Sequence, residues 1–278
     1  LNAEQMKKII LLTVLFSMCA IHAQRKPKIK GNKNVIEVSE DLPAFNAIEL
    51  NDDLDIFLKK GNTEGYQLTI DDNLVDVLKF RVVDSTLVIS SFYKITSKKK
   101  LDITINYYDL NSITVNDGRI KMQDKIDTDE LYVTTTGNAK LQLNANASVM
   151  DIVMNGNSSG DFNLEGDSLN ITLKDRIDVG IYAVSETNIL TMQNNASIKM
   201  DGSSINMQVN LTGNSNLRAQ KLQADLISAN LEGSANARIF ATKNLELSSA
   251  GSSKTYLYGD AKIEILDFLD TSELHKQK

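Results

Sequence analysis

The chain has 278 residues, of which 30 are basic and 36 acidic, giving a formal net charge of −6 at pH 7. This acidic balance disfavours nucleic acid as a partner, because domains that bind nucleic acid carry an excess of basic side chains. The single cysteine, Cys19, excludes an intrachain disulfide and a site built from several thiolates.

Residues 1–23 predict a few upstream residues followed by a signal peptide. Lys7–Lys8 form a basic start, residues 9–16 are apolar, and Ala23 is a small residue suited to cleavage. The apolar run is shorter than the about 20 residues that a membrane-spanning helix needs, and no later stretch approaches that length. We expect export to the periplasm, the outer membrane surface or the medium. Lipidation at Cys19 stays open, although methionine precedes it where a lipobox has Gly or Ala.

Residues 24–34 are basic and polar and predict a flexible leader. Residues 35–118 predict an irregular, strand-rich half, which we expect to be a broader cap of the same stack as the second half. Alternating apolar residues predict its strands at Val35–Val38, Ala47–Leu50, Asp55–Leu58, Gln67–Ile70, Leu78–Val83, Thr86–Ser90, Leu101–Asn106 and Ser112–Val115. Asn73–Leu78, after two aspartates, predicts one helical turn.

A turn recurs every 19 residues through residues 119–262, starting from the glycine just before them. Its centres are Gly118, Gly137, Gly156, Asp175, Asn194, Gly213, Gly233 and Gly251, with one residue inserted before Gly233. Asp and Asn replace glycine at two centres, and these residues tolerate the positive φ that glycine allows. A fixed period near 20 residues is typical of a solenoid.

Apolar side chains alternate on both sides of each turn. Around Gly137 they are Leu131 and Val133 before the turn and Leu141 and Leu143 after it. This alternation predicts two short strands per coil, each with one buried face, and stacked coils would pair in parallel at roughly 4.8 Å. The predicted fold is an all-β, right-handed parallel β-helix or β-solenoid of about 19 residues per coil. The alternative is a β-sandwich, which gives no reason for turns at a constant interval.

Residues 263–278 predict a C-terminal cap and tail. Ile263, Ile265 and Phe268 alternate with charged residues, and we expect their apolar side to cover the last coil. His275 falls in what we expect to be a frayed tail.

Polar residues at the turns predict structural and functional features. Asparagines follow four turn centres and predict a hydrogen-bonded amide ladder: Asn138, Asn157, Asn195 and Asn214. Asp175, Arg176 and Asp178 form a charged group that is either a decorated turn or a functional patch. The sequence predicts no catalytic, cofactor-binding or metal-binding residue and no cofactor, and it lacks the Gly-Gly-x-Gly-x-Asp series of calcium-binding repeats.

The order of several segments resembles that of a known family. The segments are Phe45–Leu50, Leu54–Gly61, Leu68–Asn73, Ser85–Ser90 and Leu110–Gly118, followed by the later Gly-Asn and Gly-Ser turns. Over roughly Val35–Ile263 the chain resembles the auto-transporter adhesin head GIN domain family, a domain-of-unknown-function family common among secreted proteins of Bacteroidetes. The resemblance implies a right-handed β-helix-like fold and an adhesive role. It supplies no catalytic residues.

The leading functional hypothesis is a non-enzymatic exported β-solenoid that acts as an adhesin or as a binding or scaffold protein of the cell envelope. One alternative is a polysaccharide lyase or hydrolase on a β-helix, and a second is a self-assembling envelope scaffold. The sequence does not identify the partner, and a cell-surface glycan or an envelope protein fits the hypothesis. Sugar binding needs exposed aromatic rings, for which the candidates are Tyr93, Tyr107, Tyr108, Tyr256 and Tyr258.

Overall fold

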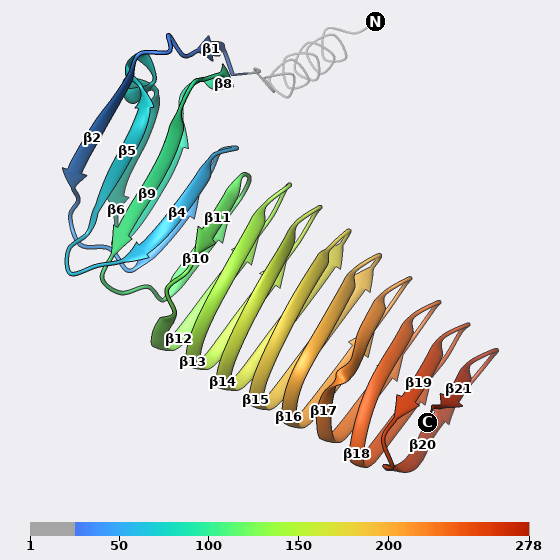
Figure 1. Ribbon diagram of the computed structural model, residues 1–278. Coiled ribbons are helices and arrows are strands. Elements are labelled where there is room, and N and C mark those ends of the chain that lie inside the picture. Colours follow the sequence, from blue (N-terminus) through green and yellow to red (C-terminus); the bar gives the residue numbers. More distant parts are fainter. Residues whose placement is uncertain (1–25, 278) are drawn as a thin grey trace, which may run out of the picture.

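The computed structural model describes residues 26–277, and these residues are built almost entirely of β-strands (Figure 1). One 3-10 helix, η1 (Asp72–Val77), interrupts them at the helical turn that the sequence predicted. None of the helical structure in this part of the chain is long or apolar enough to cross a membrane. The signal peptide predicted for residues 1–23, including Cys19, lies outside the described residues.

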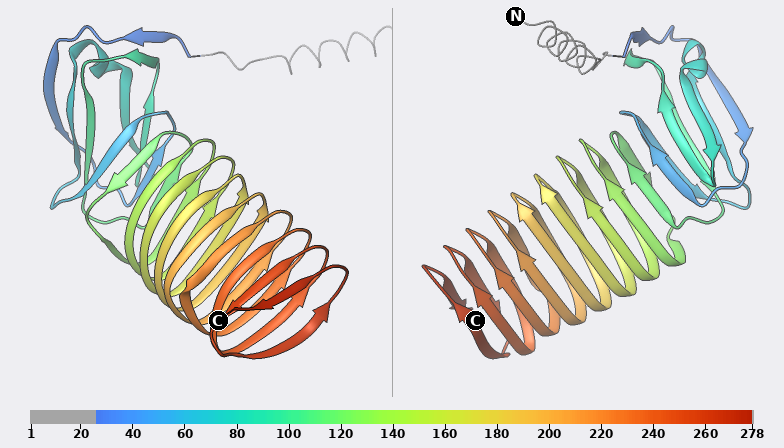
Figure 2. Two further views of the ribbon diagram at one scale, coloured as in Figure 1. Left: turned by 45° about the vertical axis from the view of Figure 1, so that its right-hand side comes forward. Right: turned by 180° about the vertical axis from the view of Figure 1, so that it is seen from behind.

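The second half is a stack of flattened coils joined by parallel pairing (Figures 1 and 2). Its strands are β10 (Ser112–Val115), β11 (Arg119–Met122), β12 (Ile126–Thr135), β13 (Lys140–Met154), β14 (Ser159–Asp175), β15 (Asp178–Asn194), β16 (Ser197–Leu211), β17 (Asn216–Leu231), β18 (Asn236–Ser249), β19 (Lys254–Tyr258), β20 (Lys262–Phe268) and β21 (Glu273–Lys276). The registers of β13, β14, β15 and β16 advance by 19 residues per coil, as in Leu141↔Gly160 and Gly160↔Val179. The predicted β-solenoid is confirmed, and the β-sandwich alternative is wrong.

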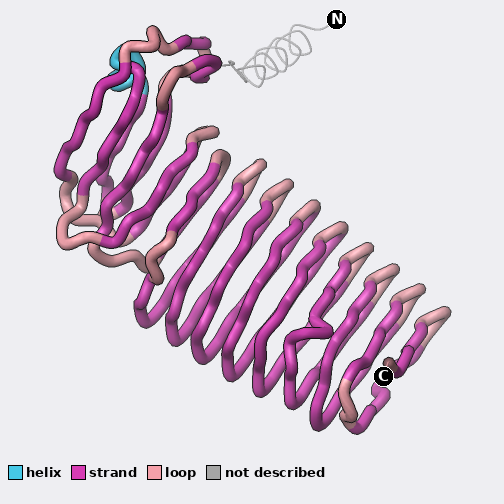
Figure 3. Tube along the Cα trace, in the orientation of Figure 1, coloured by secondary structure: helices cyan, strands magenta, loops and turns pink. Residues whose placement is uncertain are grey.

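Each coil contributes to two sheets that face each other across a thin core. We call residues that follow a tight turn the post-turn sheet, and residues that precede the next tight turn the pre-turn sheet. In β13, Leu141 of the post-turn sheet and Ile152 of the pre-turn sheet are both buried. The polar segment between them continues as a bent strand with Ala145 and Ala147 buried. All tight turns therefore lie at one edge of the stack, as the loop segments in Figure 3 show.

The tight turns have left-handed backbone geometry at the predicted centres. Gly137 and Gly213 have φ of 60° and 71°, and Asp175 and Asn194 have φ of 72° and 64° in the equivalent places. Asp and Asn are the residues other than glycine that adopt this geometry most readily. The replacement of glycine at these two coils therefore leaves the turn unchanged.

The N-terminal half is joined to this stack by hydrogen bonds but is organised differently. Its strands are β2 (Val35–Asp41), β3 (Ala47–Leu50), β4 (Asp55–Lys60), β5 (Gly65–Asp71), β6 (Leu78–Val83), β7 (Thr86–Ser91), β8 (Lys94–Ser97) and β9 (Leu101–Tyr107). Strands β3 and β4 continue the parallel stack through β10 and β11. By contrast, β2 with β5, β5 with β9 and β6 with β7 pair antiparallel, which the sequence did not predict.

The expected flexible leader contains a short strand. Strand β1 (Lys28–Lys30) pairs in parallel with β8, and the fully buried Asp71 holds the adjoining chain. The Asp71 carboxylate accepts hydrogen bonds of 3.1 Å from the backbone N–H groups of Lys33, Lys99 and Lys100. Burial raises the pKa of Asp71, but the three hydrogen bonds outweigh it and hold that pKa below its usual value.

The C-terminal end of the stack leaves apolar side chains open to solvent. Ile263 and Ile265 stand in register with Leu245 and Leu247. They are nevertheless 37% and 50% exposed, and every residue of β20 is exposed, so the strand extends the stack without burying its own apolar side chains. The frayed tail expected around His275 is wrong, since β21 pairs in parallel with β19 there.

Candidate functional site

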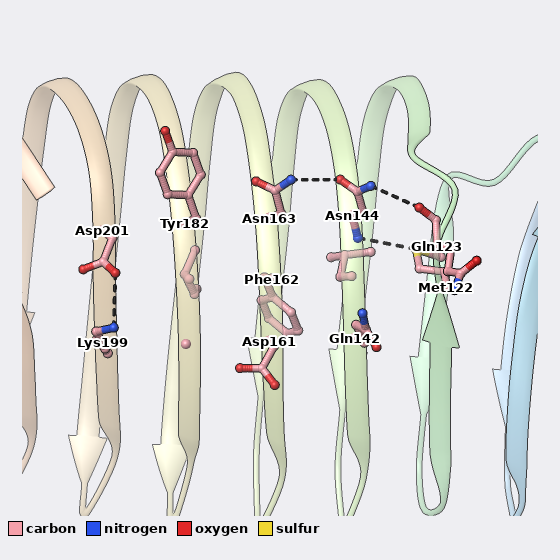
Figure 4. A pocket seen from close by; sticks show the side chains of 13 residues that line it. Met122, Gln123, Gln142, Asn144, Asp161, Phe162, Asn163, Tyr182, Lys199 and Asp201 are labelled. Carbon is pink, nitrogen blue, oxygen red and sulfur yellow. Dashed lines mark hydrogen bonds and ion pairs between the residues drawn. The ribbon is translucent and has the colours of Figure 1, made fainter. Parts of the chain in front are cut away.

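A hollow of about 550 Å³ opens on the outer face of the post-turn sheet, across β13 to β16 (Figure 4). It lies where Gly180 takes an outward-facing place in β15, between Asp161 of β14 and Lys199 of β16. A Cβ atom at Gly180 would meet only the Asp161 carboxylate, at 3.2 Å. The missing side chain at Gly180 therefore deepens the hollow at this position of the row.

Tyr182 forms a wall of this hollow, two residues after Gly180. It is 52% exposed, and its neighbours in the axial row are Asn163 and Asp201 (Figure 4). Exposed aromatic faces are the surfaces on which sugar rings stack, with the phenol oxygen left for a hydrogen bond. The sequence-based candidates omitted Tyr182. Its alternation with the inward-facing Ile181 and Ala183 was the available signal that its side chain points outward.

Hydrogen bonds orient the other polar groups around the hollow (Figure 4). Asn163 Nδ2 donates to Asn144 Oδ1 at 3.2 Å, and Asn144 Nδ2 donates to the Gln123 carbonyl at 3.4 Å. On the opposite side Lys199 Nζ lies 3.2 Å from Asp201 Oδ2. These amide and charged groups supply donors and acceptors in fixed positions beside an aromatic face, which is the arrangement that recognition of a polyhydroxyl ligand needs.

A second hollow, of about 460 Å³, adjoins the first on the side of the tight turns. Asp178 and Asp161 line it from successive coils, together with Lys199 and Arg218. Both carboxylates are exposed, whereas a carboxyl group that acts as a general acid near neutral pH needs a desolvated site. The charged group predicted from the sequence, Asp175, Arg176 and Asp178, does not form one cluster. Asp178 lies in this hollow, whereas Asp175 lies on the turn edge, where it accepts a hydrogen bond from Asn194.

The predicted tyrosines are scattered. Tyr107 is buried, and desolvation, with smaller contributions from nearby aspartates, raises its pKa to about 12. Tyr108 beside it is 62% exposed, and Tyr93 lies in the N-terminal half against Phe92. Tyr256 belongs to the post-turn sheet, far along the axis from Tyr182. Tyr258 lies on β19, opposite Phe240. None of these five tyrosines lines the hollow at Gly180, so the sequence did not locate the site.

The predicted asparagine ladder is confirmed in two pairs at the tight-turn edge. Asn157 Nδ2 donates to Asn138 Oδ1 at 3.3 Å, and Asn214 Nδ2 donates to Asn195 Oδ1 at 3.2 Å. Arg176 occupies the equivalent place between the two pairs and divides the ladder. Across residues 26–277, no three His, Cys, Asp or Glu side chains gather in a way that would hold a metal ion.

Comparison with protein-family models decides the family. The model described as "Putative auto-transporter adhesin, head GIN domain" matches residues 44–174 and 157–261. The chain belongs to the head GIN domain family. This agrees with the resemblance drawn from the order of its segments. No curated protein matches the sequence of this GIN-domain chain.

Solved structures share the fold of this GIN-domain chain at low sequence identity. A protein from Parabacteroides merdae described as a putative adhesin is 17% identical, with a TM-score of 0.68 over 91% of this chain and 100% of its own. A putative adhesin from Parabacteroides distasonis is 18% identical, with a TM-score of 0.62 over 89% and 99%. A third protein, from the same species and described as a putative lipid binding protein, is 17% identical with a TM-score of 0.64 over 90% and 100%.

Proposed function

We propose that this chain is a non-enzymatic adhesin, exported to the cell envelope, that binds surface glycans at the hollow beside Tyr182. The observation that carries the proposal is the exposed Tyr182 ring next to Gly180, the outward position without a side chain. A sugar ring stacked on Tyr182 would reach the polar groups of Asn163 and Asp201, and the next sugar unit of the chain would lie over Gly180.

The scaffold supports such a role because it holds these groups rigidly. Phe162, Ile181 and Met200 are buried beneath the hollow, on strands joined by continuous parallel pairing. Binding groups placed on strands need little ordering when a ligand arrives, so less binding free energy is lost. Export rests on the signal peptide predicted for residues 1–23 and on the adhesin description of the family.

The polysaccharide-acting enzyme is the alternative, and Asp161 and Asp178 are the groups that favour it. They lie in one hollow with Lys199 and Arg218, and enzymes that cleave polysaccharides use carboxylates in pairs. Their exposure favours binding over catalysis.

Binding of the purified chain to a panel of neutral and acidic polysaccharides tests the proposal. Tyr182→Ala removes the stacking face and should weaken binding about tenfold. Gly180→Val places a side chain in the hollow and should weaken binding. Valine favours a strand more than glycine does, and the Asp161 carboxylate, 3.2 Å from the new Cβ atom, must shift only slightly, so we expect the fold to be kept, which the melting temperature checks. Tyr132→Ala is the matched control, since Tyr132 is 47% exposed on the pre-turn sheet. Equal losses from Tyr132→Ala and Tyr182→Ala would contradict the proposal.

The same panel distinguishes adhesion from catalysis. A binding protein should leave the polysaccharides intact over a long incubation. Release of reducing or unsaturated ends, abolished by Asp178→Asn, would establish the enzyme instead.

Self-assembly is a second candidate function, favoured by the open C-terminal end. Ile265, Leu266 and Leu269 are 50%, 56% and 56% exposed there, beside the free edges of β20 and β21. Exposed apolar residues on an unpaired strand edge favour pairing with another chain.

A further inference from the structure

We infer that the ligand of this surface is a linear anionic polysaccharide that runs along the solenoid axis, from the hollow at Gly180 toward β21. This inference rests on the proposed function and names the chemistry and direction of its ligand. The feature that carries it is an axial row of cationic and aromatic side chains on the post-turn sheet, which we call the cationic row. Its members are Lys199, Arg218, Arg238, Tyr256 and His275.

The strand registers place these five side chains on one line. Lys199 of β16 pairs with Arg218 of β17, which in turn pairs with Arg238 of β18. Neighbouring parallel strands lie about 4.8 Å apart, and paired residues point to the same side of a sheet. Three cationic side chains therefore follow one another at the spacing of the coils.

A row of like charges lowers the stability of the folded protein, so we expect it only where it serves a function. Like charges on directly neighbouring strands destabilise a sheet. The chain as a whole is acidic, with a net charge of −6, so the row does not reflect a general excess of basic residues. The preceding positions of the same axial line, Gln142, Asp161 and Gly180, carry no positive charge, and they separate the row from Lys121 at the start of the line. Consecutive cationic side chains thus occur in the part of the line beyond the hollow.

The two arginines are oriented by neutral partners. Arg218 Nη2 donates to Ser197 Oγ at 3.1 Å, and the Arg238 guanidinium lies 5.2 Å from the centre of the Tyr256 ring. Within the described part of the chain neither arginine forms an ion pair, whereas Lys199 pairs with Asp201. A guanidinium group has five N–H donors in a planar fork, so both retain donors for a carboxylate or sulfate group.

The row also ends on stacked rings. Tyr256 and His275 are parallel, with ring centres 4.9 Å apart and an interplanar angle of 13°. Because Arg238 lies over one face of the Tyr256 ring and His275 over the other, this pair offers a sugar only the outer face of His275, whereas Tyr182 at the other end offers its own ring face. Lys199 and Arg218 also line the second hollow, so the hollows and the row form one continuous track.

These features favour a polysaccharide over a nucleic acid. A nucleic acid carries a charge on every nucleotide and needs a broad basic surface, whereas carboxylates interrupt this surface: Asp161 lies in the axial line, and Asp178 and Asp201 lie beside it. A linear polysaccharide with uronate or sulfate groups combines spaced anions with sugar faces that stack on aromatic rings.

The test measures binding of the full chain to polygalacturonate, dextran sulfate, neutral dextran and a single-stranded oligothymidylate. We expect the anionic polysaccharides to bind more tightly than neutral dextran. The double variant Arg218→Gln/Arg238→Gln should lose at least about tenfold in affinity for them and keep the affinity for dextran. A preference between the first two polymers separates carboxylate from sulfate as the recognised group. Arg218→Lys/Arg238→Lys should recover only part of the loss, because lysine lacks the planar fork.

The matched control is Arg81→Gln/Arg176→Gln, which removes two exposed arginines away from the row. An equal loss in this control would overturn the inference in favour of unspecific charge attraction. Tighter binding of the oligothymidylate than of polygalacturonate would overturn it in favour of nucleic acid. If Tyr182→Ala weakens dextran binding while Arg218→Gln/Arg238→Gln changes nothing, the inference fails and the proposed function stands. If no polysaccharide binds, both fail.

Discussion

Asn194 Nδ2 donates a hydrogen bond of 2.9 Å to Asp175 Oδ1, and both residues have a positive φ at the centre of a tight turn. They stand one coil apart, at the place that glycine occupies in the neighbouring coils at Gly156 and Gly213. In these two coils Asp and Asn adopt the positive φ that glycine adopts elsewhere, and their side chains form a hydrogen bond along the axis of the stack. The 19-residue repeat of the sequence thus corresponds to a row of equivalent tight turns at one edge of the stack.

The turn geometry predicts opposite outcomes for two substitutions. Gly213→Val should destabilise the fold by about 1–3 kcal/mol, because valine is strained at a positive φ. Its Cβ atom would also lie 3.0 Å from the Asn194 carbonyl oxygen. Asp175→Gly should leave stability nearly unchanged, since relief of the backbone offsets one exposed hydrogen bond. Thermal melts check both, and a badly destabilised Asp175→Gly beside an unaffected Gly213→Val would contradict the register.

The divided asparagine ladder at the tight-turn edge predicts that a substitution at Arg176 will stabilise the fold. Arg176→Asn places an amide between Asn157 and Asn195 and joins the two halves of the ladder, which should add about 0.5–1.5 kcal/mol. Chemical denaturation measures the change. Arg81→Asn, on an exposed strand position of β6, is the control and should not stabilise the protein. A melting temperature of Arg176→Asn at or below that of the parent would show that the ladder adds nothing.

The sequence predicted the regular stack because each of its signals repeats. Turn centres such as Asn194 and inward residues such as Leu141 recur at a fixed offset, so the strands of an ambiguous coil can be assigned from those of its neighbours. The N-terminal half has strands of similar pattern but no period. Alternation alone does not reveal whether β5 pairs with β9 in the parallel or the antiparallel direction.

The candidate site was missed for a different reason. A hollow depends on what stands beside a residue in space, and Gly180 becomes informative only when Asp161 and Lys199 are placed one coil away on each side. The 19-residue step would have aligned these three residues. The step fails between Arg218 and Arg238, where the inserted residue shifts the register by one. The cationic row is therefore visible only in the strand pairing.

The buried Asp71 predicts how stability depends on pH. The folded state holds the pKa of Asp71 below its usual value, so its carboxylate contributes stability above the unfolded pKa of about 3.9. That contribution is lost as the pH falls through the lower, folded pKa. Asp71→Asn should therefore melt below the parent at pH 7, because an amide cannot accept all three backbone N–H groups.

The difference between the two proteins should begin to narrow as the pH falls below about 4, where Asp71 of the unfolded parent takes up a proton, and it should close as the pH falls through the lower, folded pKa. Melting curves from about pH 3 to pH 7 measure this. Since both proteins keep every other titrating group, their difference isolates Asp71. A gap that stays constant over the whole range would show that the residue acts through packing alone.

The open end of the stack predicts association between chains. Ile265 of β20 is 50% exposed on an edge strand, and a second copy could cover it by pairing edge to edge. We expect the apparent mass of the parent in light scattering to rise with concentration. Ile265→Lys should suppress this rise, because charged residues on an edge strand oppose pairing. Ile205→Lys is the matched control, since Ile205 is 49% exposed on β16, within the stack and away from the free edge. An equal effect of both lysines would point to general surface hydrophobicity, and a parent that stays monomeric at every concentration would exclude association through this end.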